Sequence, residues 1–116
     1  INVAVVDDDE SICKSLARLL RASGMTSKSY SSAEEFLTDV NAHFDCLVLD
    51  VQLGGISGLE LAHQLVISGD STPFIFITAH DDALSRASAR AAGCAGYFSK
   101  TESSIKILPL IRRLAG

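Results

Sequence analysis

Five short apolar or β-branched runs alternate along the chain with longer stretches of helical spacing, and this alternation constrains the fold more than any other feature. It predicts an α/β protein in which helices cover a parallel sheet. Residues 47–49 are apolar at every position, which is typical of a strand buried on both faces. With 116 residues, we expect one core and a single domain over residues 1–116. The expected strands are Val3–Val6, Thr26–Tyr30, Cys46–Asp50, Phe74–Thr78 and Gly96–Ser99.

The intervening stretches carry helix signals. Ser31 and Ser32 are each followed three residues later by a glutamate, the capping-box pattern of a helix start. Asp9 is expected to cap the first helix, and Gly24 to end it. Asp81 and Asp82 are expected in the first turn of the fourth helix, where their charge suits the helix dipole. The expected helices contain Ile12 to Leu20, Phe36 to Val40, Leu59 to Val66, Asp81 to Ala92 and Ile111 to Leu114.

Pro109 lies inside the last helical pattern. Proline in a helix interior removes a hydrogen bond and costs about 3 kcal/mol, whereas its fixed φ is tolerated in the first turn. We therefore expect the last helix to begin late, with Pro109 in its first turn.

Composition excludes several classes of protein. The net charge of −4 gives no general positive field, so direct nucleic-acid binding by this chain is disfavoured. The apolar runs fall far short of the ~18 residues that a membrane span requires, and no signal-peptide pattern opens these residues. The three cysteines have no C-x-x-C spacing, which predicts neither disulfides nor zinc and favours the cytoplasm.

Polar residues follow the ends of four expected strands. In an open parallel sheet these ends lie on one edge and collect functional groups. Carboxylates crowded to about 4 Å repel by several kcal/mol unless a cation compensates them, and carboxylate and carbonyl oxygens suit Mg²⁺. We therefore predict a magnesium site with room for a phosphoryl group. The residues concerned are Asp7, Asp8, Asp9, Asp50, Thr78 and Lys100.

Asp50 is the expected nucleophile of this site, because a carboxylate can form an acyl phosphate when the charge on the phosphoryl oxygens is neutralised. Lys100 together with the metal would supply that neutralisation, and the Thr78 hydroxyl would donate a hydrogen bond to the phosphoryl group. The simpler alternatives are a solvated strand end for Asp7 and Asp8 and a surface lysine for Lys100.

Four segments carry a family resemblance: VVDDDE at 5–10, LVLDVQLGGISGLEL at 47–61, FIFITAHDD at 74–82 and GYFSK at 96–100. In this order and spacing the chain resembles, over nearly its whole length, the receiver domain of two-component response regulators, most of all those of the nitrogen-fixation regulator type. The resemblance implies a doubly wound, flavodoxin-like (βα)5 sandwich of three layers, with strand order 2-1-3-4-5.

The resemblance also implies a function, namely a signalling switch that is not an enzyme and assists only its own phosphorylation and dephosphorylation. A sensor histidine kinase or phosphotransfer protein would phosphorylate Asp50 in the presence of Mg²⁺, and the signal would leave through the face formed by the fourth helix, fifth strand and fifth helix, where a homodimer could also form. The implied roles are Asp7, Asp8, Asp50 and the backbone carbonyl of Gln52 as metal ligands, Thr78 as the switch hydroxyl, Tyr97 as the aromatic residue that changes rotamer, and Lys100 as the phosphoryl partner.

Two residues depart from the family pattern. Thr101 follows Lys100 where the family usually has a proline joined by a cis bond. A cis bond before a residue other than proline costs about 3 kcal/mol, so we expect a trans bond here, which puts the placement of Lys100 in question. Gly54 occupies a position where proline is common, which predicts a more mobile loop after Asp50.

Two other functions compete with this interpretation. Asp7 and Asp9 form a D-x-D pattern like that of the haloacid dehalogenase phosphatases, but this alternative leaves Asp50 without a role. The second alternative is a receiver-like docking or dimerisation module that is never phosphorylated. For Tyr97 alone, the simpler alternative is a residue that only packs. An output domain after residue 116 would be common for such a receiver, but these residues do not reveal one.

Overall fold

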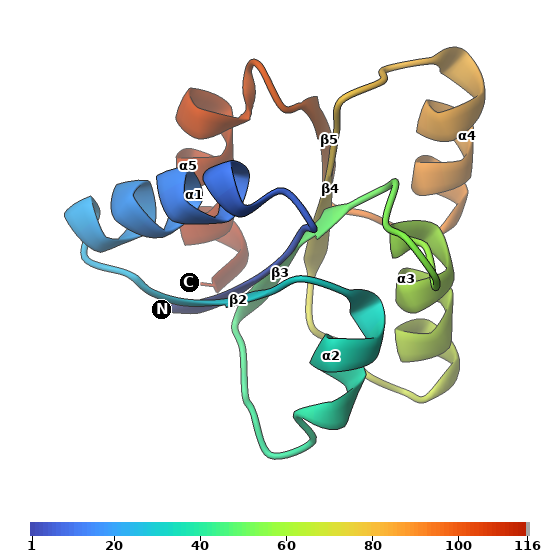
Figure 1. Ribbon diagram of the computed structural model, residues 1–116, viewed down its shortest axis with the longest axis horizontal. Coiled ribbons are helices and arrows are strands. Elements are labelled where there is room, and N and C mark those ends of the chain that lie inside the picture. Colours follow the sequence, from blue (N-terminus) through green and yellow to red (C-terminus); the bar gives the residue numbers. More distant parts are fainter. Residues whose placement is uncertain (116) are drawn as a thin grey trace.

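A computed structural model describes residues 1–115, apart from the side chains of residues 103–105. Strands and helices alternate through the whole chain, as Figure 1 shows. The strands are β1 (Asn2–Val6), β2 (Thr26–Tyr30), β3 (Cys46–Asp50), β4 (Phe74–Thr78) and β5 (Gly96–Ser99). The helices are α1 (Glu10–Ala22), α2 (Ala33–Thr38), α3 (Gly58–Ile67), α4 (Ala83–Ala91) and α5 (Ser103–Ala115).

All five strands are parallel and form one sheet of order β2-β1-β3-β4-β5. This arrangement confirms the doubly wound, flavodoxin-like fold that the sequence resemblance implied. The five expected strands are observed, with β1 beginning one residue earlier than expected. β3 is the middle strand and is buried at every position. Because the strands are parallel, their carboxyl ends lie along one edge of the sheet.

Helices cover both faces of the sheet, which gives three layers (Figure 1). On one face, α1 and α5 pack against alternate residues of the strands, including Val5, Val48 and Ile77. On the other face, α2, α3 and α4 pack against the intervening residues, including Val6 and Leu49. Successive side chains of a strand point to opposite faces of the sheet, so they belong to two separate apolar cores. Packing on both faces holds the sheet rigidly.

The ends of two helices differ from the expectation because side-chain hydrogen bonds of an aspartate fix them. α2 ends at Thr38 rather than Val40, since the Asp39 carboxylate accepts hydrogen bonds from Lys28 and Tyr30 of the neighbouring strand. α4 begins at Ala83, because Asp82 is the N-cap and its Oδ1 accepts from the Ser85 amide at 2.7 Å. Asp81 thus precedes the helix.

The expectation that α5 begins near Pro109 was wrong. α5 begins at Ser103, and Pro109 lies in its interior. Ile107 precedes the proline and is fully buried against the α1 face of the sheet, so a helix that began at Pro109 would forgo this packing. Pro109 itself is exposed, so its ring does not displace any side chain of the core. None of the described helices is long and apolar enough to cross a membrane.

Candidate functional site

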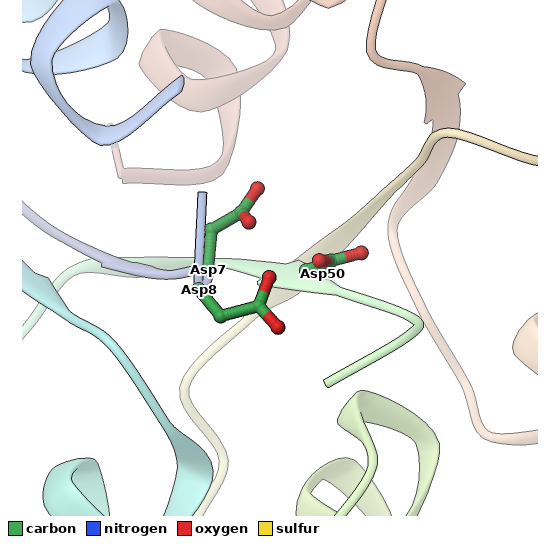
Figure 2. Close-up of side chains that lie close together, drawn as sticks. All are labelled: Asp7, Asp8 and Asp50. Atoms are coloured by element: carbon green, nitrogen blue, oxygen red, sulfur yellow. The ribbon is translucent and has the colours of Figure 1, made fainter. Parts of the chain in front are cut away.

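Three carboxylates gather at the carboxyl ends of β1 and β3. Asp50 is the last residue of β3, and Asp7 and Asp8 follow β1 directly. One oxygen of each carboxylate lies within 4.8 Å of the others, and Figure 2 shows the three side chains close together. Asp7 and Asp50 are almost completely buried, whereas Asp8 is exposed. The site is therefore an acidic recess with one side open to solvent.

Asp9 does not join this cluster. It is the N-cap of α1, and its Oδ1 accepts hydrogen bonds from the Ser11 hydroxyl at 2.7 Å and the Ser11 amide at 3.0 Å. These bonds, the hydroxyl bond first, hold the pKa of Asp9 below its ordinary value, although burial opposes them. The capping role predicted for Asp9 is confirmed, and the carboxylates that lie together are those of Asp7, Asp8 and Asp50.

Lys100 reaches into the recess from the turn after β5. Its Nζ lies 2.9 Å from Asp7 Oδ2 and 3.2 Å from Asp50 Oδ2, and only 14% of its side chain is exposed. The backbone amide of Lys100 donates to the Thr78 carbonyl at 2.8 Å, which extends the pairing of β4 and β5 by one residue. The bond to Thr101 is trans, as predicted, and it still allows the ammonium group to bridge both buried carboxylates.

The charges in the recess are unbalanced, because three carboxylates face one ammonium group. Burial, and secondarily the charge of Asp7, raises the pKa of Asp50 from 3.8 to about 6, although Lys100 and the Gln52 amide act in the opposite direction. Burial lowers the pKa of Lys100, but its contacts with Asp7 and Asp50 outweigh this and raise it overall. A divalent cation would relieve the crowding, and the oxygen-only donor set fits Mg²⁺.

The chain after Asp50 turns tightly around the site. The Gln52 amide donates to Asp50 Oδ1 at 3.1 Å, which holds the carboxylate against the start of the loop. Gly58, the first residue of α3, lies so close that an added Cβ would be 2.0 Å from the Asp50 carbonyl oxygen. The importance of Gly58 was missed, although a glycine at a helix start after a strand-end aspartate was a usable signal.

Thr78 lies at the end of β4, beside Asp50, but its hydroxyl is engaged elsewhere. Thr78 Oγ1 donates to the His80 carbonyl at 3.0 Å and accepts from the His80 amide at 3.0 Å. These two bonds close a small ring within the loop after β4. The position of Thr78 at the strand end agrees with the prediction, and the two hydrogen bonds of its hydroxyl are to His80 rather than to the acidic cluster.

Tyr97 lies on β5 in register with Phe76 of β4. Its hydroxyl is buried and close to the Thr78 side chain, although no hydrogen bond of good geometry forms there among the described residues. Burial raises its pKa, with a further contribution from Asp81. The Arg86 guanidinium of α4 lies 5.3 Å from the ring centroid and also pairs with Asp81. Tyr97 thus links the β4–α4 loop and α4 to β5.

Comparison with known proteins agrees with this arrangement. Residues 3–112 match the family described as the response regulator receiver domain. TodT, a response regulator protein of Pseudomonas putida, is 36% identical over 111 residues, which cover 95% of this chain and 49% of TodT. FixJ, a transcriptional regulatory protein of Azorhizobium caulinodans, is 36% identical over 116 residues, which cover 98% of this chain and 54% of FixJ. The chain thus spans about half the length of these curated relatives.

A solved structure shares the architecture as well. The BeF3-activated receiver domain of DrrB, a protein of Thermotoga maritima, superposes with a TM-score of 0.88 at 30% identity and covers 97% of this chain and 95% of its own. The sequence resemblance and the strand order are both confirmed by these comparisons.

Proposed function

The chain belongs to the response regulator receiver family, and from this premise we propose that it is a phosphorylation-dependent signalling switch in which Asp50 accepts the phosphoryl group. The donor would be a phosphohistidine on a sensor kinase or phosphotransfer protein. The observation that carries the proposal is the position of Lys100 Nζ, 3.2 Å from Asp50 and 2.9 Å from Asp7. A lysine held there can neutralise charge on a phosphoryl group at Asp50.

In the proposed transfer, an Asp50 carboxylate oxygen attacks the phosphorus atom in line with the leaving nitrogen. The new P–O bond makes an acyl phosphate, while the P–N bond breaks and its electron pair returns to the imidazole, which takes up a proton. Lys100 faces the phosphoryl oxygens, and the Gln52 amide holds the Asp50 carboxylate in place. Water would later hydrolyse the acyl phosphate, so the chain turns over only its own modification.

Mg²⁺ fits the recess as the cation of this reaction. Its ligands from the chain would be Asp7, Asp8, Asp50 and the Gln52 carbonyl, which leaves positions for water and phosphoryl oxygens. When bound, the ion would offset the repulsion between the carboxylates and the incoming phosphoryl group. Asp7 is fixed for this role because its Oδ1 accepts the Asp9 amide at 2.9 Å.

The proposed switch begins at Thr78. A phosphoryl group adds roughly 1.5 to 2 negative charges and three strong acceptors beside its hydroxyl. Thr78 would then exchange its bonds with His80 for a bond to the phosphoryl group, and the loop after β4 would move with it. Tyr97 would follow into the vacated space, and the face of α4, β5 and α5 would change shape, where effectors or a second copy of the chain could bind.

The test is phosphorylation by acetyl phosphate with Mg²⁺, followed by mass spectrometry of the labelled peptide. We expect one phosphoryl group on Asp50, and none in the Asp50→Asn variant. Asp9→Asn is the matched control, because asparagine still caps α1 and should leave uptake unchanged. Label on Asp7 would instead support a phosphatase, and absence of both uptake and beryllofluoride binding would support a docking module that is never phosphorylated.

A further inference from the structure

The turn that carries Lys100 is closed by a reciprocal pair of hydrogen bonds between Ser99 and Glu102. The Glu102 amide donates to the Ser99 carbonyl at 3.1 Å, and the Ser99 amide donates to Glu102 Oε1 at 3.2 Å. The hydroxyl groups of Ser99 and Thr101 are 2.9 Å apart within the same turn. Lys100 is therefore enclosed by a ring of contacts formed by its own neighbours.

Lys100 is also fixed on its other side. Its amide donates to the Thr78 carbonyl, which anchors the residue to the end of β4. The turn thus holds the Lys100 backbone between β4 and the Glu102 carboxylate, and its side chain extends from this point to Asp7 and Asp50. A shift of the turn by a fraction of an ångström would move Nζ relative to both carboxylates.

Glu102 has a second, exposed contact on the helix surface. Its second oxygen, Oε2, accepts from Lys106 Nζ one helical turn later, at 3.1 Å. The hydrogen bond from the Ser99 amide, and then the Lys106 ammonium, keep the pKa of Glu102 below its ordinary value. Glu102 is thus a charged acceptor for the Ser99 amide, and such bonds are stronger than neutral ones.

We propose that Glu102 is a positioning residue for Lys100. Through its bond to the Ser99 amide, its carboxylate fixes a trans Lys100–Thr101 turn so that the ammonium group meets the Asp7 and Asp50 carboxylates. This inference rests on the proposed function of Asp50 only for its effect on phosphoryl chemistry; the effect on the placement of Lys100 is independent of it.

The first experiment measures beryllofluoride binding with Mg²⁺ present. Glu102→Ala removes the acceptor for the Ser99 amide and should weaken binding about 10-fold, the usual effect of losing an outer positioning contact. Glu102→Gln retains an acceptor oxygen and should restore most of the affinity. Lys106→Ala is the matched control, because it leaves the bond between Glu102 and Ser99 in place and should bind nearly as well as the natural chain.

A double-mutant cycle separates positioning from general stability. In a Lys100→Ala background, Glu102→Ala should cause no further loss of beryllofluoride affinity, because the residue through which it acts is gone. An equal loss in both backgrounds, or full affinity in Glu102→Ala alone, would overturn the inference.

The second experiment does not depend on phosphoryl chemistry. NMR relaxation of the Lys100 side-chain methylene groups should show faster motion in Glu102→Ala than in the natural chain or in Lys106→Ala. If the natural chain bound no beryllofluoride, the proposed function would fail while this measurement still tested Glu102. Unchanged Lys100 motion in Glu102→Ala would refute the positioning role whatever the binding result.

Discussion

The α-carbon of Gly58 packs directly against the backbone carbonyl of Asp50, so that a Cβ at position 58 would lie 2.0 Å from the carbonyl oxygen. Gly58→Ala must therefore push the start of α3 away from the end of β3. We expect the variant to lose about 1–3 kcal/mol of unfolding free energy, the usual cost of overpacking, measured by urea denaturation. Its phosphorylation by acetyl phosphate should also slow, because the loop between Asp50 and α3, which includes the Gln52 amide bonded to Asp50 Oδ1, is displaced.

Gly54→Ala is the control for this prediction. Gly54 lies in the same loop, but nothing lies within 4 Å of a Cβ added there, and its φ is not in the left-handed region. Its unfolding free energy should change little. Equal stability of the Gly58 and Gly54 variants would show that the contact with Asp50 is not tight.

Asp50 should make the metal-free chain less stable as the pH rises. Its pKa is raised from 3.8 to about 6 in the folded chain, so the folded state binds more protons than the unfolded state between these values. Stability therefore falls as the pH increases through this window. In EDTA at pH 8, Asp50→Asn should be more stable than the natural chain by roughly 1–3 kcal/mol, as judged by urea denaturation.

The advantage of Asp50→Asn should shrink as the pH is lowered toward 4, and it should also shrink when Mg²⁺ replaces EDTA. A variant that was less stable than the natural chain at pH 8 in EDTA would contradict the charge imbalance described for the recess.

Asp39 should make the chain more stable as the pH rises, whereas Asp50 should make it less stable. The hydrogen bond from Lys28, and then that from Tyr30, lower its pKa below 3.8 in the folded chain. A lowered carboxylate pKa gives stability that is present above the unfolded value of 3.8 and lost as the pH falls through the folded value. Thermal melts should show that Asp39→Asn loses less stability between pH 5 and pH 2 than the natural chain does.

Lys28→Gln is a useful companion to Asp39→Asn, since it removes the cation and retains the Tyr30 hydrogen bond. Between pH 5 and pH 2, Lys28→Gln should lose less stability than the natural chain and more than Asp39→Asn. If the acid transition were identical in all three proteins, the contact between α2 and β2 would have no role in it.

Pro109→Ala should stabilise the chain. The proline lies in the interior of α5, where it cannot donate to the preceding turn, and it is exposed, so alanine restores a hydrogen bond without disturbing the core. Helix propensities place the gain at about 1–3 kcal/mol. Pro73→Ala, which lies just before β4, is the control and should give no such gain. A melting temperature below that of the natural chain would mean that α5 depends on the proline.

The strands and the residues of the candidate site were predictable because both depend on patterns of neighbouring residues along the chain. Runs such as Cys46–Asp50 are short and apolar at nearly every position, which favours a strand buried on two faces over a helix. Once the strands are parallel, the residues that end them must share an edge. The neighbouring positions of β1 and β3, which bring Asp7 close to Asp50, came from the strand order that the family resemblance implied.

What the sequence did not predict depends on contacts between distant segments. The start of α5 is decided by the burial of Ile107 rather than by the local preference of Pro109. The end of α2 depends on Lys28 and Tyr30, which belong to a neighbouring strand. The turn from Ser99 to Glu102 also could not be assigned a role from the sequence, because its effect depends on the contacts of Lys100 with Asp7 and Asp50, which follow distant strands.

The central place of β3 bears on how this molecule can respond to modification. A strand paired on both sides and covered on both faces opens only when most of the fold opens, so amide hydrogen exchange should be slowest there. Asp50 is thus anchored to a part that does not yield, while the loops around it are joined to less protected segments. If Asp50 carries the proposed phosphoryl group, we expect the surrounding loops to rearrange rather than β3.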